Sequence, residues 1–221
     1  MARKKKIDNA LRKRIRQREE RERRQYRTTP VRTRILIVCE REKTEPSYFE
    51  AFRRALPKGV VELEITGTGD NTLNVVNKAI EERNERANTN RAYDQTWAVF
   101  DKDSFSDQRF NEAVFLAGRE KVGCAYSNEA FELWYLLHFE FYQNAASRTQ
   151  YGDLLSKHLE RPYQKNDIEV FATLQQQGDV HQAIRWAKEL SERYDNHSPA
   201  QNNPATYVFK LVEELLIYWP S

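Results

Sequence analysis

One continuous apolar segment, Ile35 to Cys39, constrains the fold more than any other feature of this sequence. Its residues (Ile-Leu-Ile-Val-Cys) include no polar side chain, whereas a strand with one face in water alternates apolar and polar residues. A short, β-branched run without alternation predicts a strand that is buried on both faces, as in a parallel sheet covered by helices on each side. Glu40 follows at the carboxyl end of this strand.

Strand-like and helix-like segments alternate through the following hundred residues. The strand-like segments are 34–39, 60–66, 96–100 and 123–126, and the helical segments are 44–56, 72–86, 106–118 and 129–138. This order predicts an α/β fold with a mainly parallel sheet and right-handed crossovers. After Phe141 the strand signals stop, and segments 148–160, 180–194 and 205–218 have helical spacing. We expect a basic N-terminal arm (1–30), an α/β core (31–141) and a C-terminal helical extension packed on that core (142–221).

The basic arm carries most of the positive charge. Residues 1–30 contain thirteen Lys or Arg and four acids, which gives a net charge of +9, while the remaining residues sum to −6. A basic segment on a mildly acidic body is suited to polyanions. The candidate nucleic-acid contacts are Arg12, Lys13, Arg14, Arg16 and, next to Glu40, Arg41. Alternatively, the arm is a solvated leader that improves solubility or docks onto a partner protein.

Composition also limits the compartment and the chemistry. The chain has two cysteines and no leader-like segment, and no apolar run approaches the roughly 18 residues of a membrane span. We therefore expect a cytoplasmic protein without membrane contact. No Walker motif is present, so the chain is not expected to hydrolyse ATP by itself.

Acidic residues follow two of the predicted strands. Glu40 follows the first strand, and Asp101 and Asp103 follow the third. If the two strands are neighbours, the three carboxylates meet at the carboxyl edge of the sheet, where α/β proteins bind ligands. Crowded carboxylates repel one another unless a cation neutralises them, and Mg²⁺ or Mn²⁺ prefers such oxygen ligands. Glu40 would be a metal ligand or a general base.

Three further residues could support this site. Lys43 could neutralise phosphate charge in a transition state, and Glu129 and Glu132, near the start of the helix after the fourth strand, could complete a metal shell. Each position also has a structural explanation. Acids such as Glu45 and Glu129 are favoured in the first turn of a helix by its dipole, and a DxD pair alone is a weak metal signal.

Four motifs in this order resemble the RloB-like family. They are Cys39 to Phe49 (CEREKTEPSYF), Val99 to Asp103 (VFDKD), Ala125 to Trp134 (AYSNEAFELW) and Asn203 to Thr206 (NPAT). The similarity extends from about residue 34 to residue 216. One departure is Arg41, where the family usually has glycine. A glycine would let the backbone after Glu40 turn tightly around a phosphate group, and the arginine puts such a turn in doubt.

The resemblance implies a Toprim-like fold in which Glu40, Asp101 and Asp103 form the Mg²⁺ site. It also implies a nuclease effector of antiphage defence that is encoded near restriction loci and acts with an ATPase partner on DNA or a structured RNA such as tRNA. The alternatives are a non-catalytic Toprim-like module that binds the ATPase or senses a phage component, and a phosphatase or nucleotide-processing enzyme that uses the same acids. The number of metal ions and the assembly state, including a homo-oligomer, stay open.

Overall fold

The computed structural model describes residues 33–41, 43–57, 59–69, 71–103, 105–165, 167, 169–195 and 197–220. The proposed nucleic-acid contacts Arg12, Lys13, Arg14 and Arg16 lie outside the described residues.

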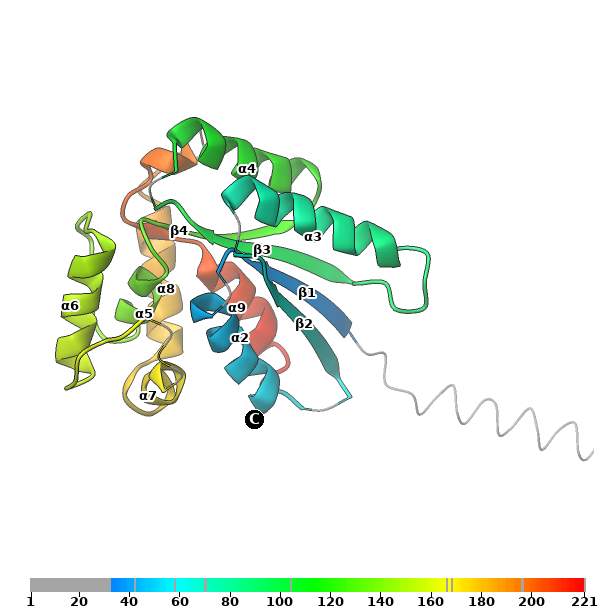
Figure 1. Cartoon of the computed structure of the whole chain (residues 1–221). Helices are drawn as coiled ribbons and strands as arrows, with labels where there is room; N and C mark the ends of the chain where they lie inside the picture. Colours follow the sequence, from blue (N-terminus) through cyan, green and yellow to red (C-terminus); the bar gives the residue numbers. More distant parts are fainter. Residues whose placement is uncertain are drawn as a thin grey trace, which may run out of the picture. The chain divides into compact units, whose positions relative to one another are not determined.

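A five-stranded sheet in the order β2-β1-β3-β4-β5 forms the centre of the fold (Figure 1). Its strands are β1 (Thr33–Cys39), β2 (Val61–Gly67), β3 (Gln95–Asp101), β4 (Gly123–Asn128) and β5 (Ala205–Thr206). The first four strands pair in parallel, and β5 pairs antiparallel with β4. The predicted α/β fold with a mainly parallel sheet is confirmed.

Helices cover both faces of this sheet. They are α2 (Thr44–Ala55), α3 (Thr72–Arg86), α4 (Asp107–Arg119), α5 (Glu132–Leu136), α6 (Arg148–His158), α7 (Val170–Gln177), α8 (Val180–Ser191), the 3₁₀ turn η1 (Pro199–Gln201) and α9 (Val208–Leu216). In Figure 1, α3 and α4 lie on one face of the sheet, whereas α2 and α9 lie on the other. The C-terminal helices that the spacing predicted are present.

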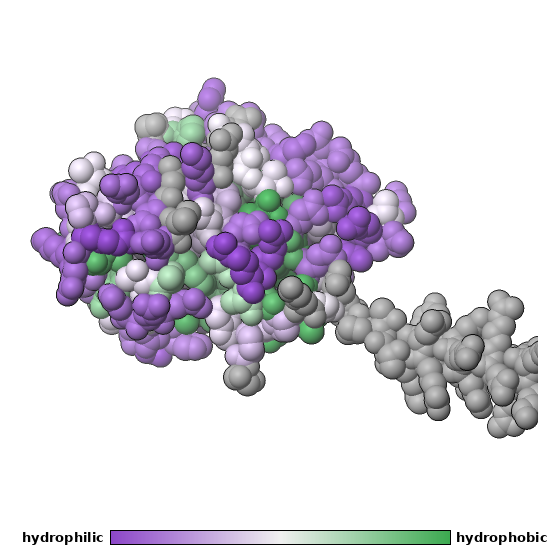
Figure 2. Space-filling model, turned by 60° about the horizontal axis from the view of Figure 1, so that its bottom comes forward, coloured by the Kyte–Doolittle hydropathy of each residue, from purple (hydrophilic) through white to green (hydrophobic). Residues whose placement is uncertain are grey.

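The central strand explains why the sequence forms this arrangement. β1 lies between β2 and β3, and Ile35 to Cys39 are completely buried. Because a helix layer covers each face, both sets of alternating side chains are removed from water. Burying each large aliphatic side chain contributes about 1.5–3 kcal/mol, so the unbroken apolar run stabilises this central position. The face of the molecule drawn in Figure 2 is mainly hydrophilic, with hydrophobic side chains reaching the surface in places.

Two helices begin several residues later than the sequence predicted. The segment 205–218 was predicted as one helix, but Ala205–Thr206 form β5 and the helix begins at Val208. A two-residue strand is too short to show a period, and it exists because Ser127 and Asn128 offer an edge for pairing. The helix predicted from Glu129 begins at Glu132, because the Glu129 carbonyl accepts a hydrogen bond from the Asp103 amide (3.1 Å).

The helix α7 was not predicted, since its eight residues are too few to show a clear helical period. Among the described residues, no helix has both the length and the apolar character that crossing a lipid bilayer requires.

Candidate functional site

The ends of β1 and β3 bring Glu40 and Asp101 together. The two strands are direct neighbours, with Cys39 opposite Val99, so their carboxyl ends share one edge of the sheet. The side-chain oxygen Oε2 of Glu40 accepts a hydrogen bond from the Asp101 amide at 3.0 Å. Because an aspartate side chain is short, the two carboxyl groups lie within about 8 Å of one another. The adjacency on which the acidic site depends is therefore present.

Asp103 reaches the same site along a different path. The chain leaves the extended conformation after Asp101, and Asp103 has a positive φ of 38°. Its side chain is one-third exposed, whereas that of Asp101 is 2% exposed. The alternation of a continuing strand therefore does not hold the two aspartates together. An arginine from a distant helix does so.

Arg148, the first residue of α6, bridges the two aspartates. Its Nη2 atom lies 2.9 Å from Oδ2 of Asp101, and its Nη1 atom lies 3.1 Å from Oδ2 of Asp103. A capping box between Ser147 and Gln150 determines where α6 begins and so where Arg148 projects. Arg148 was not predicted as a site residue. A local signal existed, because a cation in the first turn opposes the helix dipole and needs a tertiary partner.

Arg41 pairs with the same acids from the other side. Its Nη2 atom lies 2.8 Å from Oδ2 of Asp103, and its Nε atom lies 3.9 Å from Oδ2 of Asp101. The Nε atom is also 3.7 Å from Oε1 of Glu45. The guanidinium predicted to contact nucleic acid therefore contacts acidic side chains of its own chain.

Two further buried acids complete the group. Glu45, in the first turn of α2, is 0% exposed, and Glu132, in the first turn of α5, is 2% exposed. Oε2 of Glu132 lies 3.5 Å from Nε of Arg148, and the Tyr163 hydroxyl donates a hydrogen bond to its Oε1 at 3.2 Å. We call the five acids the acidic cluster: Glu40, Glu45, Asp101, Asp103 and Glu132.

The two other predicted site residues lie beside the cluster. Glu129 is half-buried and joins the site through its backbone carbonyl, which accepts from Asp103, whereas the neighbouring Glu132 contributes its carboxylate. Lys43 is exposed immediately before α2 and makes no ion pair with any described residue. Lys102, between the two aspartates, has a largely buried side chain that pairs with Asp107 at 3.1 Å.

Burial shifts the acidity of the cluster. Burial raises the pKa of Glu40 above its ordinary value and raises the pKa of Glu45 to about 7. Burial, with the nearby charges of Glu45 and Glu132, also raises the pKa of Asp101 well above its ordinary value. Burial works in the same direction at Asp103, but Arg148 and Arg41 outweigh it and lower the pKa of that carboxyl. The deep carboxyl groups therefore hold protons, or attract cations, more readily than exposed ones.

Several buried oxygens of the cluster accept no hydrogen bond. Within the described part of the chain, Oδ1 of Asp101 and both carboxylate oxygens of Glu45 are buried without a hydrogen bond. Five carboxylates face two guanidinium groups, so the fully ionised cluster carries excess negative charge. Unpaired buried carboxylate oxygens are costly, and a proton or a cation relieves that cost.

The donor set fits a hard divalent cation by its chemistry, because carboxylate oxygens are the ligands that Mg²⁺ and Mn²⁺ prefer. As the side chains lie, however, no three His, Cys, Asp or Glu groups among the described residues are placed to hold a metal ion. The guanidinium of Arg148 lies between Asp101, Asp103 and Glu132, where such groups would otherwise meet.

An open groove with polar side chains in its walls adjoins the end of β1. It has a volume of about 590 Å³, and Thr68, Asn74, Asn77 and Lys78 are among the residues that line it. The Thr68 hydroxyl lies 3.3 Å from the backbone carbonyl of Glu40 and donates a hydrogen bond to it, so the groove begins beside the end of β1.

Comparisons with known proteins gave one match. The model of a protein family described as RloB-like protein matches residues 35–215. No curated protein and no solved structure matches this sequence.

Proposed function

This chain belongs to the RloB-like family, and on that premise we propose that it is a cytoplasmic, Mg²⁺- or Mn²⁺-dependent nuclease that acts in antiphage defence with an ATPase partner. The substrate would be DNA or a structured RNA such as tRNA. One observation carries the proposal: Glu40 and Asp101 lie at adjacent ends of parallel strands, and Asp101 keeps an unpaired, buried carboxylate oxygen.

Glu40, Asp101 and Asp103 are the residues that would hold the metal ion. When bound, a divalent ion polarises a phosphoryl oxygen and helps a water molecule to attack phosphorus. Of the three, Asp103 has the lowered pKa and is the most exposed, so its carboxylate is ionised and accessible. Glu40 already accepts a hydrogen bond from the Asp101 amide, which orients its carboxylate toward the cluster.

The two arginines supply the charge that a phosphodiester requires. Arg148 and Arg41 each place guanidinium nitrogens on Asp101 and Asp103. A phosphate offers the same charge and the same paired oxygens, so either guanidinium could exchange a carboxylate for a phosphate. In this proposal, Lys43, which is exposed before α2, and the groove beside Thr68 would contact the adjoining backbone of the substrate.

The test uses the purified full-length chain, alone and with the ATPase encoded nearby. Plasmid DNA and tRNA are incubated with Mg²⁺, with Mn²⁺ or with EDTA, and we expect cleavage only with a divalent ion. Asp101→Asn and Glu40→Gln should each lower the rate at least about 100-fold, as is common when a group that stabilises the transition state is lost. Glu112→Gln, an exposed acid on α4, should cut at the wild-type rate.

A second candidate function rests on the arginines themselves. Because Arg148 and Arg41 occupy the acidic cluster, the cluster could be a structural ion-pair network in a non-catalytic module that binds the ATPase or a phage component. No specific divalent binding by calorimetry, together with intact defence in an Asp101→Asn/Asp103→Asn variant, would favour the module. Faster turnover of small phosphoesters than of oligonucleotides would indicate a phosphatase.

A further inference from the structure

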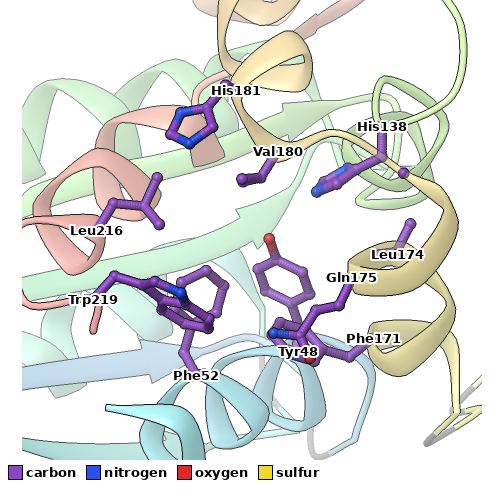
Figure 3. Close-up of a pocket in the computed structure, with 11 residues that line it drawn as sticks. Tyr48, Phe52, His138, Phe171, Leu174, Gln175, Val180, His181, Leu216 and Trp219 are labelled. Atoms are coloured by element: carbon purple, nitrogen blue, oxygen red, sulfur yellow. The ribbon is translucent and has the colours of Figure 1, made fainter. Parts of the chain in front are cut away.

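A pocket separate from the acidic cluster lies between α2, α7, α8 and the residues around the end of α9 (Figure 3). Its volume is about 210 Å³, and its walls include Phe52, Phe171, Leu174, Leu216 and Trp219. An apolar cavity of roughly 150 Å³ is large enough to bind benzene, so this pocket has room for a ring system of one or two fused rings.

The aromatic walls meet edge to face. The ring centroids of Phe52 and Trp219 are 5.1 Å apart with an interplanar angle of 68°, and those of Phe52 and Phe171 are 5.4 Å apart at 69°. Tyr48 continues the series against Phe171 at 5.3 Å and 70°. Aromatic rings favour such edge-to-face arrangements. The planar ring of a bound ligand can make the same kind of edge-to-face contact with these walls.

His138 adds a hydrogen-bond acceptor to the walls, which are mainly apolar but also include the side chains of Gln175 and His181. Its Nδ1 atom lies 2.9 Å from the carbonyl oxygen of Trp134, and a carbonyl only accepts, so Nδ1 carries the hydrogen. Burial lowers the pKa of His138 to about 4, which leaves the ring neutral at pH 7. A neutral imidazole with its hydrogen on Nδ1 has a lone pair on Nε2.

That lone pair has no partner within the described ranges. Figure 3 shows the His138 ring entering the pocket, close to Tyr48 and Val180. None of the described residues donates a hydrogen bond to Nε2. A ligand in the pocket could therefore donate a hydrogen bond to this lone pair. A charged ligand would lose its hydration against the apolar walls, which favours a neutral one.

We propose that this pocket binds a small, neutral aromatic compound whose single N–H or O–H group donates a hydrogen bond to Nε2 of His138. Indole and phenol represent this chemical class. The proposal does not depend on nuclease activity, because none of the residues that line the pocket belongs to the acidic cluster.

Calorimetric titration of the full-length chain tests the proposal with a matched pair of probes. Indole has an N–H donor, whereas benzofuran has nearly the same shape without one. We expect indole to bind at least about tenfold more tightly than benzofuran, the ratio that one satisfied hydrogen bond supplies. Indole should also move the ¹⁵N chemical shift of His138 Nε2 in the direction of hydrogen-bond acceptance.

A variant that fills the pocket provides the second readout. Val180→Trp places a large side chain at the pocket wall and should abolish indole binding while the circular dichroism spectrum stays unchanged. Phe115→Trp, at an exposed position on α4 (52% exposed), should bind indole like the wild type. No saturable indole binding at millimolar concentration, or equal binding of indole and benzofuran, overturns the proposal. If Val180→Trp does not fold, the ¹⁵N shift decides the question alone.

Discussion

Arg148 and Asp101 are 47 positions apart in the sequence, yet Nη2 of the arginine lies 2.9 Å from Oδ2 of the aspartate inside the acidic cluster. This contact joins the first turn of α6 to the carboxyl end of β3. It also places one guanidinium among three carboxylates, since Asp103 and Glu132 lie within ion-pair distance of the same side chain.

We expect Arg148→Ala to lower the free energy of unfolding by about 3 kcal/mol, because it leaves buried carboxylates without their cation. Urea denaturation measures the loss. Adding Mg²⁺ should restore more stability to this variant than to the wild type, since a divalent ion can replace the missing charge. The matched control is Arg119→Ala, which removes an arginine that is 74% exposed and whose one ion pair among the described residues is with its neighbour Glu120. The control should change stability by less than about 0.5 kcal/mol. Equal losses in the two variants would contradict the stabilising role of Arg148.

The pH dependence of stability should reveal the buried His138. Burial lowers its pKa from 6.5 to about 4, so the unfolded chain binds a proton more readily than the folded chain between these values. The free energy of unfolding therefore falls as the pH drops from about 6.5 to about 4, by up to about 3 kcal/mol.

Glu45 acts in the opposite sense over much of this range, because burial raises its pKa to about 7 and a raised carboxyl pKa costs stability as the pH rises. The informative quantity is therefore the difference between the wild type and His138→Gln, measured by urea denaturation from pH 4 to pH 7. That difference should shrink toward low pH. His197→Gln, at an exposed position, serves as the control and should show a constant difference.

Two glycines offer a direct test of packing at β4. A Cβ atom at Gly123 would lie 2.4 Å from the ring of Trp97, on the neighbouring strand β3, whereas a Cβ atom at Gly118, in α4, would have no heavy atom within 4 Å. Gly123→Ala should destabilise the protein by about 1–3 kcal/mol, the usual cost of overpacking. Gly118→Ala should stabilise it by about 0.5–1 kcal/mol, because alanine reduces the entropy of the unfolded chain. Denaturant midpoints that move in the same direction would count against the close contact with Trp97.

The salt dependence of nucleic-acid binding tests the basic arm. Alanine at Arg12, Lys13, Arg14 and Arg16 removes four positive charges. If all four contact duplex phosphates, the slope of log K against log salt should become less steep by about 3.6, according to counterion release. Fluorescence anisotropy with a labelled duplex measures the slope.

A control with the same change in net charge separates specific contacts from overall attraction. It neutralises four exposed basic residues on the described body: Arg119, Lys157, Lys165 and Arg185. The slope of this control should stay close to that of the wild type, whereas equal changes in both variants would favour the view that the arm is a solvated leader.

The sequence by itself determined the parallel sheet and the place of Glu40 and Asp101 in the acidic cluster. Ile35 to Cys39 could only be stable with both faces covered, and parallel strands place residues such as Glu40 and Asp101 at a common edge. These features follow from local periodicity and from the direction of the strands, and both can be read from short windows of sequence.

Only the tertiary structure decided that Arg148 enters the cluster, that Glu132 contributes its carboxylate instead of Glu129, and that residues 205–206 extend the sheet. Each of these contacts depends on how a distant segment packs, and a pattern of neighbouring residues carries no information about that packing. The electrostatic cost of buried carboxylates selects such partners, and it acts only once the folded chain has excluded water from the site.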